Sequence, residues 1–272
     1  MILGICTNMN ARSPMDVGLD QARYAEKIGL EYLELSVDRI MRYDDFRFET
    51  FKKELAEESP LPCLACNNFI DPAIKLAGRD FNQNVFENYI TKAVSRIAAI
   101  GAKKAVFGSA KARAIPSYLS AEEGRAQIIE RIRFIAAAAE KHGIEIEIEH
   151  LNRTESNCIN TFEESVAIAK QLNRPNVKSI FDYYHFAVSG EREELIRQNE
   201  AWIGHMHFAC TMERRMPDLD EAKKLESLFY LLRDLSYNGT FSIEAYFPNY
   251  EMDNLYYKTP IAYIQDILNG KG

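Results

Sequence analysis

The stretch E-I-E-I-E-H (Glu145–His150) alternates glutamate with isoleucine, and this period of two predicts a β-strand. The isoleucines would cover one face of the strand. The other face would carry three carboxylates, those of Glu145, Glu147 and Glu149. Buried carboxylates are costly unless a cation or a hydrogen-bond donor accompanies them. The stretch therefore predicts a strand of the protein interior whose polar face has a definite task.

Similar apolar runs recur along the whole chain roughly every 30–35 residues, and amphipathic helical patterns separate them. The predicted strands are Ile2–Thr7, Tyr32–Ser36, Cys63–Asn67, Lys104–Phe107, Glu145–His150, Val177–Phe181, Ile203–Phe208 and Phe241–Ala245. The helical patterns are clearest over Val85–Ile100, Ala121–His142, Phe162–Leu172 and Asp220–Tyr237. This alternation predicts parallel β-strands joined by helical crossovers.

Such a chain can form an open doubly wound sheet or a closed (β/α)8 TIM barrel. The open sheet is favoured by phosphate-binding loops, but the sequence contains neither G-x-G-x-x-G nor G-x-x-x-x-G-K-[ST]. It also lacks the G-x-S-x-G nucleophile motif. We therefore expect an α/β protein with a (β/α)8 barrel, in a single domain spanning residues 1–272.

Composition narrows the class of partner. The net charge of −7 and the pI near 5.4 argue against nucleic acid as a partner, since phosphate backbones require a basic face. No apolar run has membrane-spanning length, and the N-terminus lacks the pattern of a signal peptide. We expect a cytoplasmic protein that acts on a small molecule.

In a TIM barrel, the chemistry gathers at the C-terminal ends of the strands. The last four predicted strands each end with a potential metal ligand: Glu149, Asp182, His207 and Glu244. Taken one at a time, each of these residues could equally be a helix cap or a buried polar residue with a structural role. Together they predict a site for a divalent cation, because carboxylates crowded into one lumen repel one another without it. Three carboxylates and one imidazole suit manganese, cobalt or magnesium better than tetrahedral zinc.

Several segments of the second half resemble the xylose isomerase-like TIM barrels, in particular the ketose 3-epimerases that act on D-tagatose and D-allulose. The segments are E-H-L-N-R-T-E (Glu149–Glu155), D-Y-Y-H (Asp182–His185), H-M-H (His205–His207), R-R-M-P (Arg214–Pro217) and S-I-E (Ser242–Glu244).

The resemblance implies that Glu149, Asp182, His207 and Glu244 bind Mn²⁺ or Co²⁺, with Mg²⁺ or Zn²⁺ as further possibilities. It implies that Glu149 and Glu244 are the acid–base pair of a C3 epimerisation. It also implies sugar contacts from Glu155, His185 and an arginine after the seventh strand, and a homodimer or homotetramer.

The sequence departs from the family pattern after His207. The family has an acidic residue three positions later and an arginine six positions later, where this chain has Cys210 and Glu213. An extra loop residue would bring Arg214 to the site, with Arg215 as the alternative. After the fourth strand, Arg113 and Lys111 lie in a loop where they either contact the substrate or face solvent.

Other activities use the same barrel. A sugar-phosphate epimerase, a hydroxypyruvate isomerase and an inosose isomerase or dehydratase would share the metal and the glutamates. A barrel that only binds sugar is disfavoured by the presence of both Glu149 and Glu244. A DNA-cleaving relative with three zinc ions is disfavoured because the chain has only five histidines and is acidic.

If Glu149 points into the barrel, alternation also directs Glu147 and Glu145 inward. We expect Glu147 to be buried under the metal layer and hydrogen-bonded to His205 or Ser242. We expect Glu145 to pair with Lys178 or another base near the barrel floor, or to turn to solvent.

Overall fold

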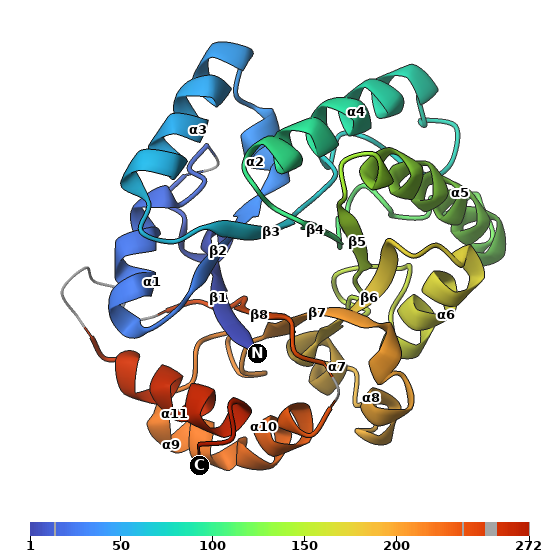
Figure 1. The fold of residues 1–272 in the computed structure, drawn as a ribbon. Coiled ribbons are helices and arrows are strands. Elements are labelled where there is room, and N and C mark those ends of the chain that lie inside the picture. The colour runs from blue at the N-terminus through green and yellow to red at the C-terminus, as the bar shows by residue number, and fades with distance from the viewer. Residues whose placement is uncertain (14, 236, 248–254, 272) are drawn as a thin grey trace.

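The chain forms a closed barrel of parallel strands, which confirms the predicted fold and excludes the open sheet (Figure 1). The computed structural model describes residues 1–13, 15–235, 237–247 and 255–271. The strands follow the chain order around the barrel, and β1 closes it by pairing with β8. They are β1 (Ile2–Cys6), β2 (Tyr32–Ser36), β3 (Cys63–Asn67), β4 (Lys104–Phe107), β5 (Glu145–Ile148), β6 (Val177–Asp182), β7 (Ile203–Phe208) and β8 (Thr240–Ile243).

Helices surround the barrel on its outside (Figure 1). They are α1 (Ala22–Ile28), α2 (Val37–Met41), α3 (Asp45–Glu58), α4 (Gln83–Ala99), α5 (Ala121–Glu140), α6 (Phe162–Leu172), α7 (Tyr183–Val188), α8 (Glu194–Gln198), α9 (Leu219–Lys224), α10 (Glu226–Arg233) and α11 (Lys258–Leu268). Short 3-10 turns lie at Thr7–Asn10, Leu19–Gln21 and Glu200–Trp202. Side-chain caps fix several N-termini; Asn82, Ser120 and Thr161 accept hydrogen bonds from the first turns of α4, α5 and α6.

Most predicted elements agree with the structure to within a few residues, and one helix was wrong. The range Asp220–Tyr237 was predicted as one helix, but it contains two, α9 and α10, separated at Leu225. Residue 236 of that range lies outside the described residues. β5 and β8 end one residue before Glu149 and Glu244, so both glutamates begin the loops above the barrel.

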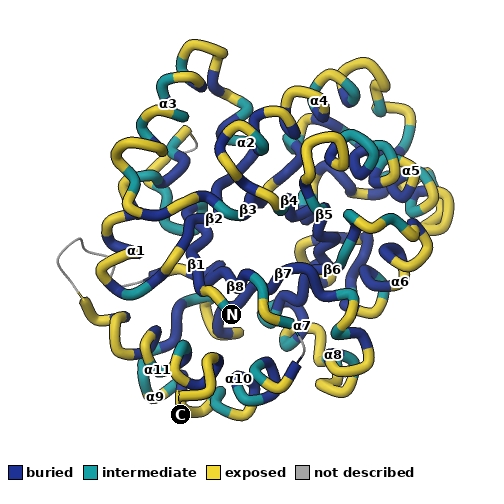
Figure 2. The backbone as a smooth tube through the Cα atoms, viewed as in Figure 1, coloured by how far each residue is buried: buried dark blue, intermediate teal, exposed yellow. Residues whose placement is uncertain are grey.

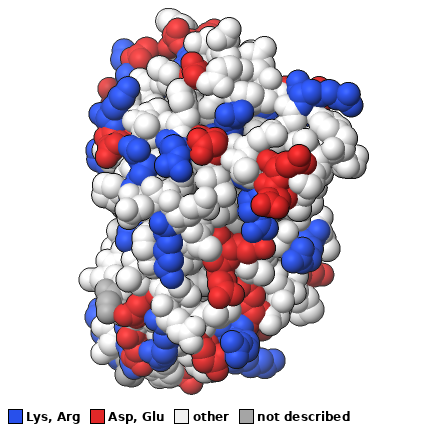
Figure 3. Space-filling model, turned by 90° about the vertical axis from the view of Figure 1, so that its right-hand side faces the viewer, with Lys and Arg blue, Asp and Glu red and all other residues white. Residues whose placement is uncertain are grey.

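The barrel strands are buried on both faces, whereas the helices expose their outer sides (Figure 2). Ile146 and Ile148 are fully buried in the hydrophobic core, as the alternation in β5 requires. None of the helices described here is long and apolar enough to cross a membrane. On the face seen in Figure 3, basic and acidic side chains are intermingled.

Candidate metal centre at the ends of strands five to eight

Four side chains from successive strands meet at the C-terminal end of the barrel. Glu149 follows β5, Asp182 ends β6, His207 lies near the end of β7 and Glu244 follows β8. One ligand atom from each lies within 4.8 Å of those of the other three, and all four residues are buried. The structure thus brings together the four residues predicted from the strand ends.

His207 Nδ1 faces the three carboxylates. It lies 3.7 Å from Glu149 Oε1, 3.8 Å from Asp182 Oδ2 and 3.3 Å from Glu244 Oε2. Among the described residues, neither His207 Nδ1 nor Asp182 Oδ2 has a hydrogen-bond partner, although both atoms are buried. Buried polar atoms normally find a partner. A divalent cation between these donors would supply it, so the residues fit the metal that the donor set suggests.

The two glutamates of the cluster differ electrostatically. Burial raises the pKa of Glu149, and the neighbouring Glu244 carboxylate adds to this effect. Burial would also raise the pKa of Glu244, but the charges of Arg214 and His207 lower it below the ordinary value. At Asp182, burial is outweighed by His185 and Arg214, and the pKa falls to about 2. A bound cation would favour the charged form of all three carboxylates.

His185 lies beside the cluster with one ring nitrogen fixed and the other available. Its Nδ1 accepts a hydrogen bond from the Asn152 backbone N–H at 3.2 Å, and the Asn152 side chain lies at 3.0 Å. An accepting Nδ1 places the proton on Nε2. Nε2 is buried, has no hydrogen-bond partner among the described residues and lies 3.9 Å from Asp182 Oδ2. His185 therefore presents a donor toward the metal cluster.

Arg214 reaches the cluster and Arg215 does not. Arg214 Nη2 donates to Glu244 Oε2 at 2.6 Å, and its Nη1 lies 3.5 Å from Glu155 Oε1. Its guanidinium lies over the Tyr184 ring at 4.7 Å. Arg215 instead pairs with Glu221 on α9.

The backbone conformation of the loop after β7 explains why Arg214 reaches the cluster and Arg215 does not. Glu213 and Arg214 both adopt left-handed φ values, 57° and 48°. Hydrogen bonds to a segment after β8 hold the loop in place: Tyr246 N–H donates to Arg214 O at 2.9 Å, and Met216 N–H donates to Tyr246 O at 2.8 Å. These unfavourable conformations turn the loop so that one arginine points inward and the next outward.

Arg113 occupies a different place from the predicted one. Its side chain is fully buried, and it donates to three backbone carbonyls: Glu149 O at 2.7 Å, Phe107 O at 3.1 Å and Ile159 O at 3.5 Å. These bonds tie the end of β4 to the end of β5 and fix the backbone that carries Glu149. The N–H groups are directed to the protein, so a substrate contact by Arg113 does not fit this geometry; Lys111 is exposed.

Deeper in β5, Glu147 is buried as expected and Glu145 is partly exposed, but the predicted partner of Glu147 was wrong. Glu147 is fully buried, and Lys104 Nζ lies 3.3 Å from it and 2.7 Å from Glu145. Glu145 was expected to pair with Lys178 or another base, and that base is Lys104. It is close because β4 pairs with β5 with Lys104 directly opposite Glu145. The Lys178 amine donates to Ala201 O instead.

Glu34, in the middle of β2, is a residue of the site that was not predicted from the sequence. Glu34 is fully buried and binds both His205 and His207. Burial alone would raise its pKa, but the two imidazoles lower it well below the ordinary value. The alternation in Tyr32–Ser36, with leucines on the opposite face, was a signal that could have found it.

With this geometry established, the family can be identified. The sequence profile described as xylose isomerase-like TIM barrel matches residues 22–267. The chain belongs to this family. It is 26% identical over 228 residues to the D-psicose 3-epimerase of Agrobacterium fabrum, an alignment that covers 81% of this chain and 76% of that protein. It is 31% identical over 133 residues to the 2-oxo-tetronate isomerase of Cupriavidus necator, covering 48% of this chain and 51% of that protein.

Solved structures show the same fold. A D-psicose 3-epimerase crystallised in the presence of D-fructose superposes with a TM-score of 0.82 at 20% identity and covers 100% of both chains. The IOLI protein with a binding zinc atom superposes with a TM-score of 0.72 at 19% identity, covering 100% of this chain and 99% of that one.

Proposed function

We propose that the chain is a divalent-metal-dependent ketose 3-epimerase. The observation that carries the proposal is the convergence of Glu149, Asp182, His207 and Glu244, with buried donor atoms that lack a partner in the described structure. The similarity to D-psicose 3-epimerase supports the reaction class and a sugar as the substrate.

The four residues would hold the cation, and we propose Mn²⁺ or Co²⁺ because oxygen donors dominate the set. When bound, the cation supplies Lewis-acid polarisation of the substrate oxygens next to the reacting carbon. The chain's own residues then have to move a proton from one face of that carbon and return one to the other face.

Strands β5 and β8 are not neighbours in the barrel, which supports the choice of Glu149 and Glu244 as the pair for this exchange. Either carboxylate can accept the substrate's C3 proton, and the other then delivers a proton to the opposite face. Arg214 holds the Glu244 carboxylate through a bond of 2.6 Å, which fixes its orientation. Asn152, which contacts both His185 and Glu155, holds these two in register.

Binding of the sugar would use the donors and acceptors that surround the cluster. His185 Nε2 and Arg214 can donate to substrate oxygens near the reacting carbon. Glu155 lies on the rim with 35% of its side chain exposed, so it can accept from a hydroxyl further along the sugar. These assignments follow the resemblance and fit the positions that the side chains occupy.

The proposal is tested by incubating the protein with free and phosphorylated ketoses in D₂O with added Mn²⁺. Mass spectrometry after metal removal should show one deuterium entering the substrate, and sugar analysis should show its C3 epimer. An aldose product would instead indicate an aldose–ketose isomerase. Absence of exchange with every ketose would contradict the proposal. The cytoplasmic location and the homodimer or homotetramer stay predictions.

A further inference from the structure

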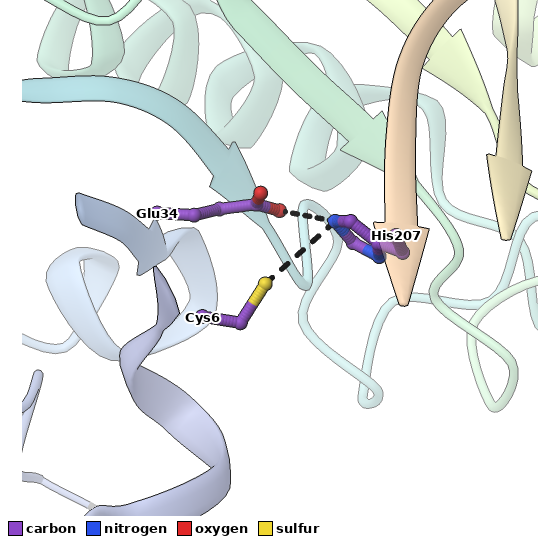
Figure 4. Close-up of side chains that lie close together, drawn as sticks. All are labelled: Cys6, Glu34 and His207. Atoms are coloured by element: carbon purple, nitrogen blue, oxygen red, sulfur yellow. Dashed lines mark hydrogen bonds and ion pairs between the residues drawn. The ribbon is translucent and has the colours of Figure 1, made fainter. Parts of the chain in front are cut away.

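The carboxylate of Glu34 lies beneath the metal cluster and points toward the His207 ring (Figure 4). Glu34 Oε1 lies 2.9 Å from His207 Nε2. Its Oε2 lies 2.8 Å from His205 Nε2 and accepts from Ser242 Oγ at 2.5 Å. Three donors therefore converge on one buried carboxylate, which offsets the cost of removing its charge from water.

The contact with His207 determines which ring nitrogen carries the proton. A carboxylate offers only acceptors, so His207 Nε2 must donate to Glu34. In a neutral imidazole, Nδ1 then keeps a free electron pair, and Nδ1 is the atom that faces Glu149, Asp182 and Glu244. The opposite tautomer would direct an N–H group into the cluster and prevent coordination through Nδ1.

Glu34 is itself held in place by a second set of contacts. Tyr32 Oη lies 2.6 Å from Ser242 Oγ, and because the serine proton is used toward Glu34, the tyrosine is the donor. Thr240 Oγ1 lies 2.7 Å from His205 Nδ1, so the hydroxyl can donate there and leave the His205 Nε2 proton for Glu34. Both chains of hydrogen bonds end at Glu34 and restrict its rotation.

Glu34 and His207 could instead form part of a second cation site together with Cys6. Cys6 Sγ lies 3.7 Å from His207 Nε2, so Cys6, Glu34 and His207 could offer a thiolate, a carboxylate and an imidazole to a second cation (Figure 4). However, the Glu34 oxygens already accept from three side chains. The hydrogen-bonded arrangement accounts for every one of these contacts without a second ion.

We propose that Glu34 is a positioning residue that fixes the Nε2–H tautomer and the ring orientation of His207 and thereby sets the affinity of the metal centre. This inference rests on the proposed metal site. Residues that orient a ligating histidine in this way typically change metal affinity by about 10–100-fold when they are replaced.

The test compares Glu34→Gln with Glu147→Gln in isothermal titration with Mn²⁺. Glu147 is the matched control, since it is also a fully buried inward-facing glutamate but contacts Lys104 and none of the four cluster residues. The wild-type protein should bind one cation per chain, Glu34→Gln about 10–100-fold more weakly, and Glu147→Gln within about threefold of wild type. Equal affinity of Glu34→Gln and wild type would overturn the role of Glu34.

Other outcomes are equally decisive. If the wild-type protein binds no cation, the metal centre itself fails and this role fails with it. Two cations per chain would favour the second site at Cys6 over the positioning role. Should Glu34→Gln fail to fold, ¹H–¹⁵N correlation spectra of wild-type protein labelled at its five histidines and loaded with Zn²⁺ still decide. A proton on Nε2 of His207 supports the proposal, and a proton on Nδ1 overturns it.

Discussion

Two groups of carboxylates lie along the inward face of β5, and they differ in what balances their charge. Near the barrel floor, Glu145 and Glu147 contact Lys104, whose amine also donates to Gly204 O at 2.6 Å. At the C-terminal end, Glu149 faces the carboxylates of Asp182 and Glu244, and the cation supplied by the protein is Arg214 at the rim. The first group has a partner within its own layer, whereas the second has a gap between its donors.

The difference shows how to separate a structural ion cluster from a site. A buried carboxylate with a lysine on the neighbouring strand has its counter-charge within the protein and needs no cation from solution. Carboxylates that lie close together, with metal-ligand atoms that have no hydrogen-bond partner, need a cation from solution. The alternation of β5 is the same in both layers. The neighbouring strands decide which layer becomes functional.

The largest expected effect separates Glu149 and Glu244 from Glu147. Glu149→Gln and Glu244→Gln should each lower turnover by at least about 10²–10⁴-fold, because each removes a proton-transfer group and weakens the metal site. Glu147→Gln, two residues before Glu149, should keep turnover within about tenfold of wild type. Initial rates on an active ketose, with circular dichroism as a check of folding, measure this; near-normal rates in either of the first two variants would contradict the assignment.

Replacing Lys104, the partner of Glu145 and Glu147 at the barrel floor, should give a large decrease in the free energy of unfolding. Lys104→Met leaves Glu147 buried without its counter-charge, and breaking such a pair costs about 3–5 kcal/mol. Lys178→Met is the control; its amine donates to Ala201 O at the surface and lies over the Trp202 ring at 5.2 Å, contacts whose loss should cost no more than about 1 kcal/mol. Urea denaturation of both variants at fixed pH measures the difference. Equal losses would show that Lys104 does not balance the buried charge.

This variant also has a predictable pH dependence. Burial already raises the pKa of Glu147 well above its ordinary value, although Lys104 opposes the effect. Without Lys104 the folded protein binds more protons than the unfolded chain at every pH between the unfolded pKa of about 4.3 and the raised folded pKa. The free energy of unfolding of Lys104→Met should therefore fall as pH rises through that window. A stability that increases with pH would contradict this explanation.

Cation binding should stabilise the folded protein through the cluster of Glu149, Asp182, His207 and Glu244, independently of Lys104 and its partners. At a free Mn²⁺ concentration of 100 times Kd, linkage predicts about 2.7 kcal/mol of added stability. Wild type and Lys104→Met should gain the same increment in thermal or urea unfolding, while Asp182→Asn should gain much less. Loss of the increment in Lys104→Met would show that the two clusters are not independent.

The smallest effect concerns the rim. Arg214→Ala should lower kcat/KM roughly tenfold or more, in line with the loss of a hydrogen bond to a charged group worth about 1.5–3 kcal/mol. Arg215→Ala should change it less than about threefold, since Arg215 pairs with Glu221 away from the cluster. Steady-state kinetics decide between them. The reverse ranking would show that the loop presents the other arginine to the substrate.

The fold class and the four residues of the cluster could be predicted from the sequence alone. Period-two alternation fixes the face on which each side chain lies, and strand ends of a parallel barrel share one rim, so Glu149, Asp182, His207 and Glu244 could be placed together without coordinates. Burial of Glu147 follows from the same alternation. These properties are local or depend only on the order of the elements.

The pairing of the buried groups, in contrast, depends on the three-dimensional arrangement of the strands. Alternation directs Glu34, Glu147 and His205 inward, but which of them meet depends on strand pairing and on the closure of the barrel, which brings distant segments of the chain together. This is why Lys104 replaced the predicted partners of Glu147, and why Glu34 on β2 reaches His207 on β7. The loop conformation that selects Arg214 over Arg215 depends on contacts with the segment after β8, which the sequence around the arginines does not contain.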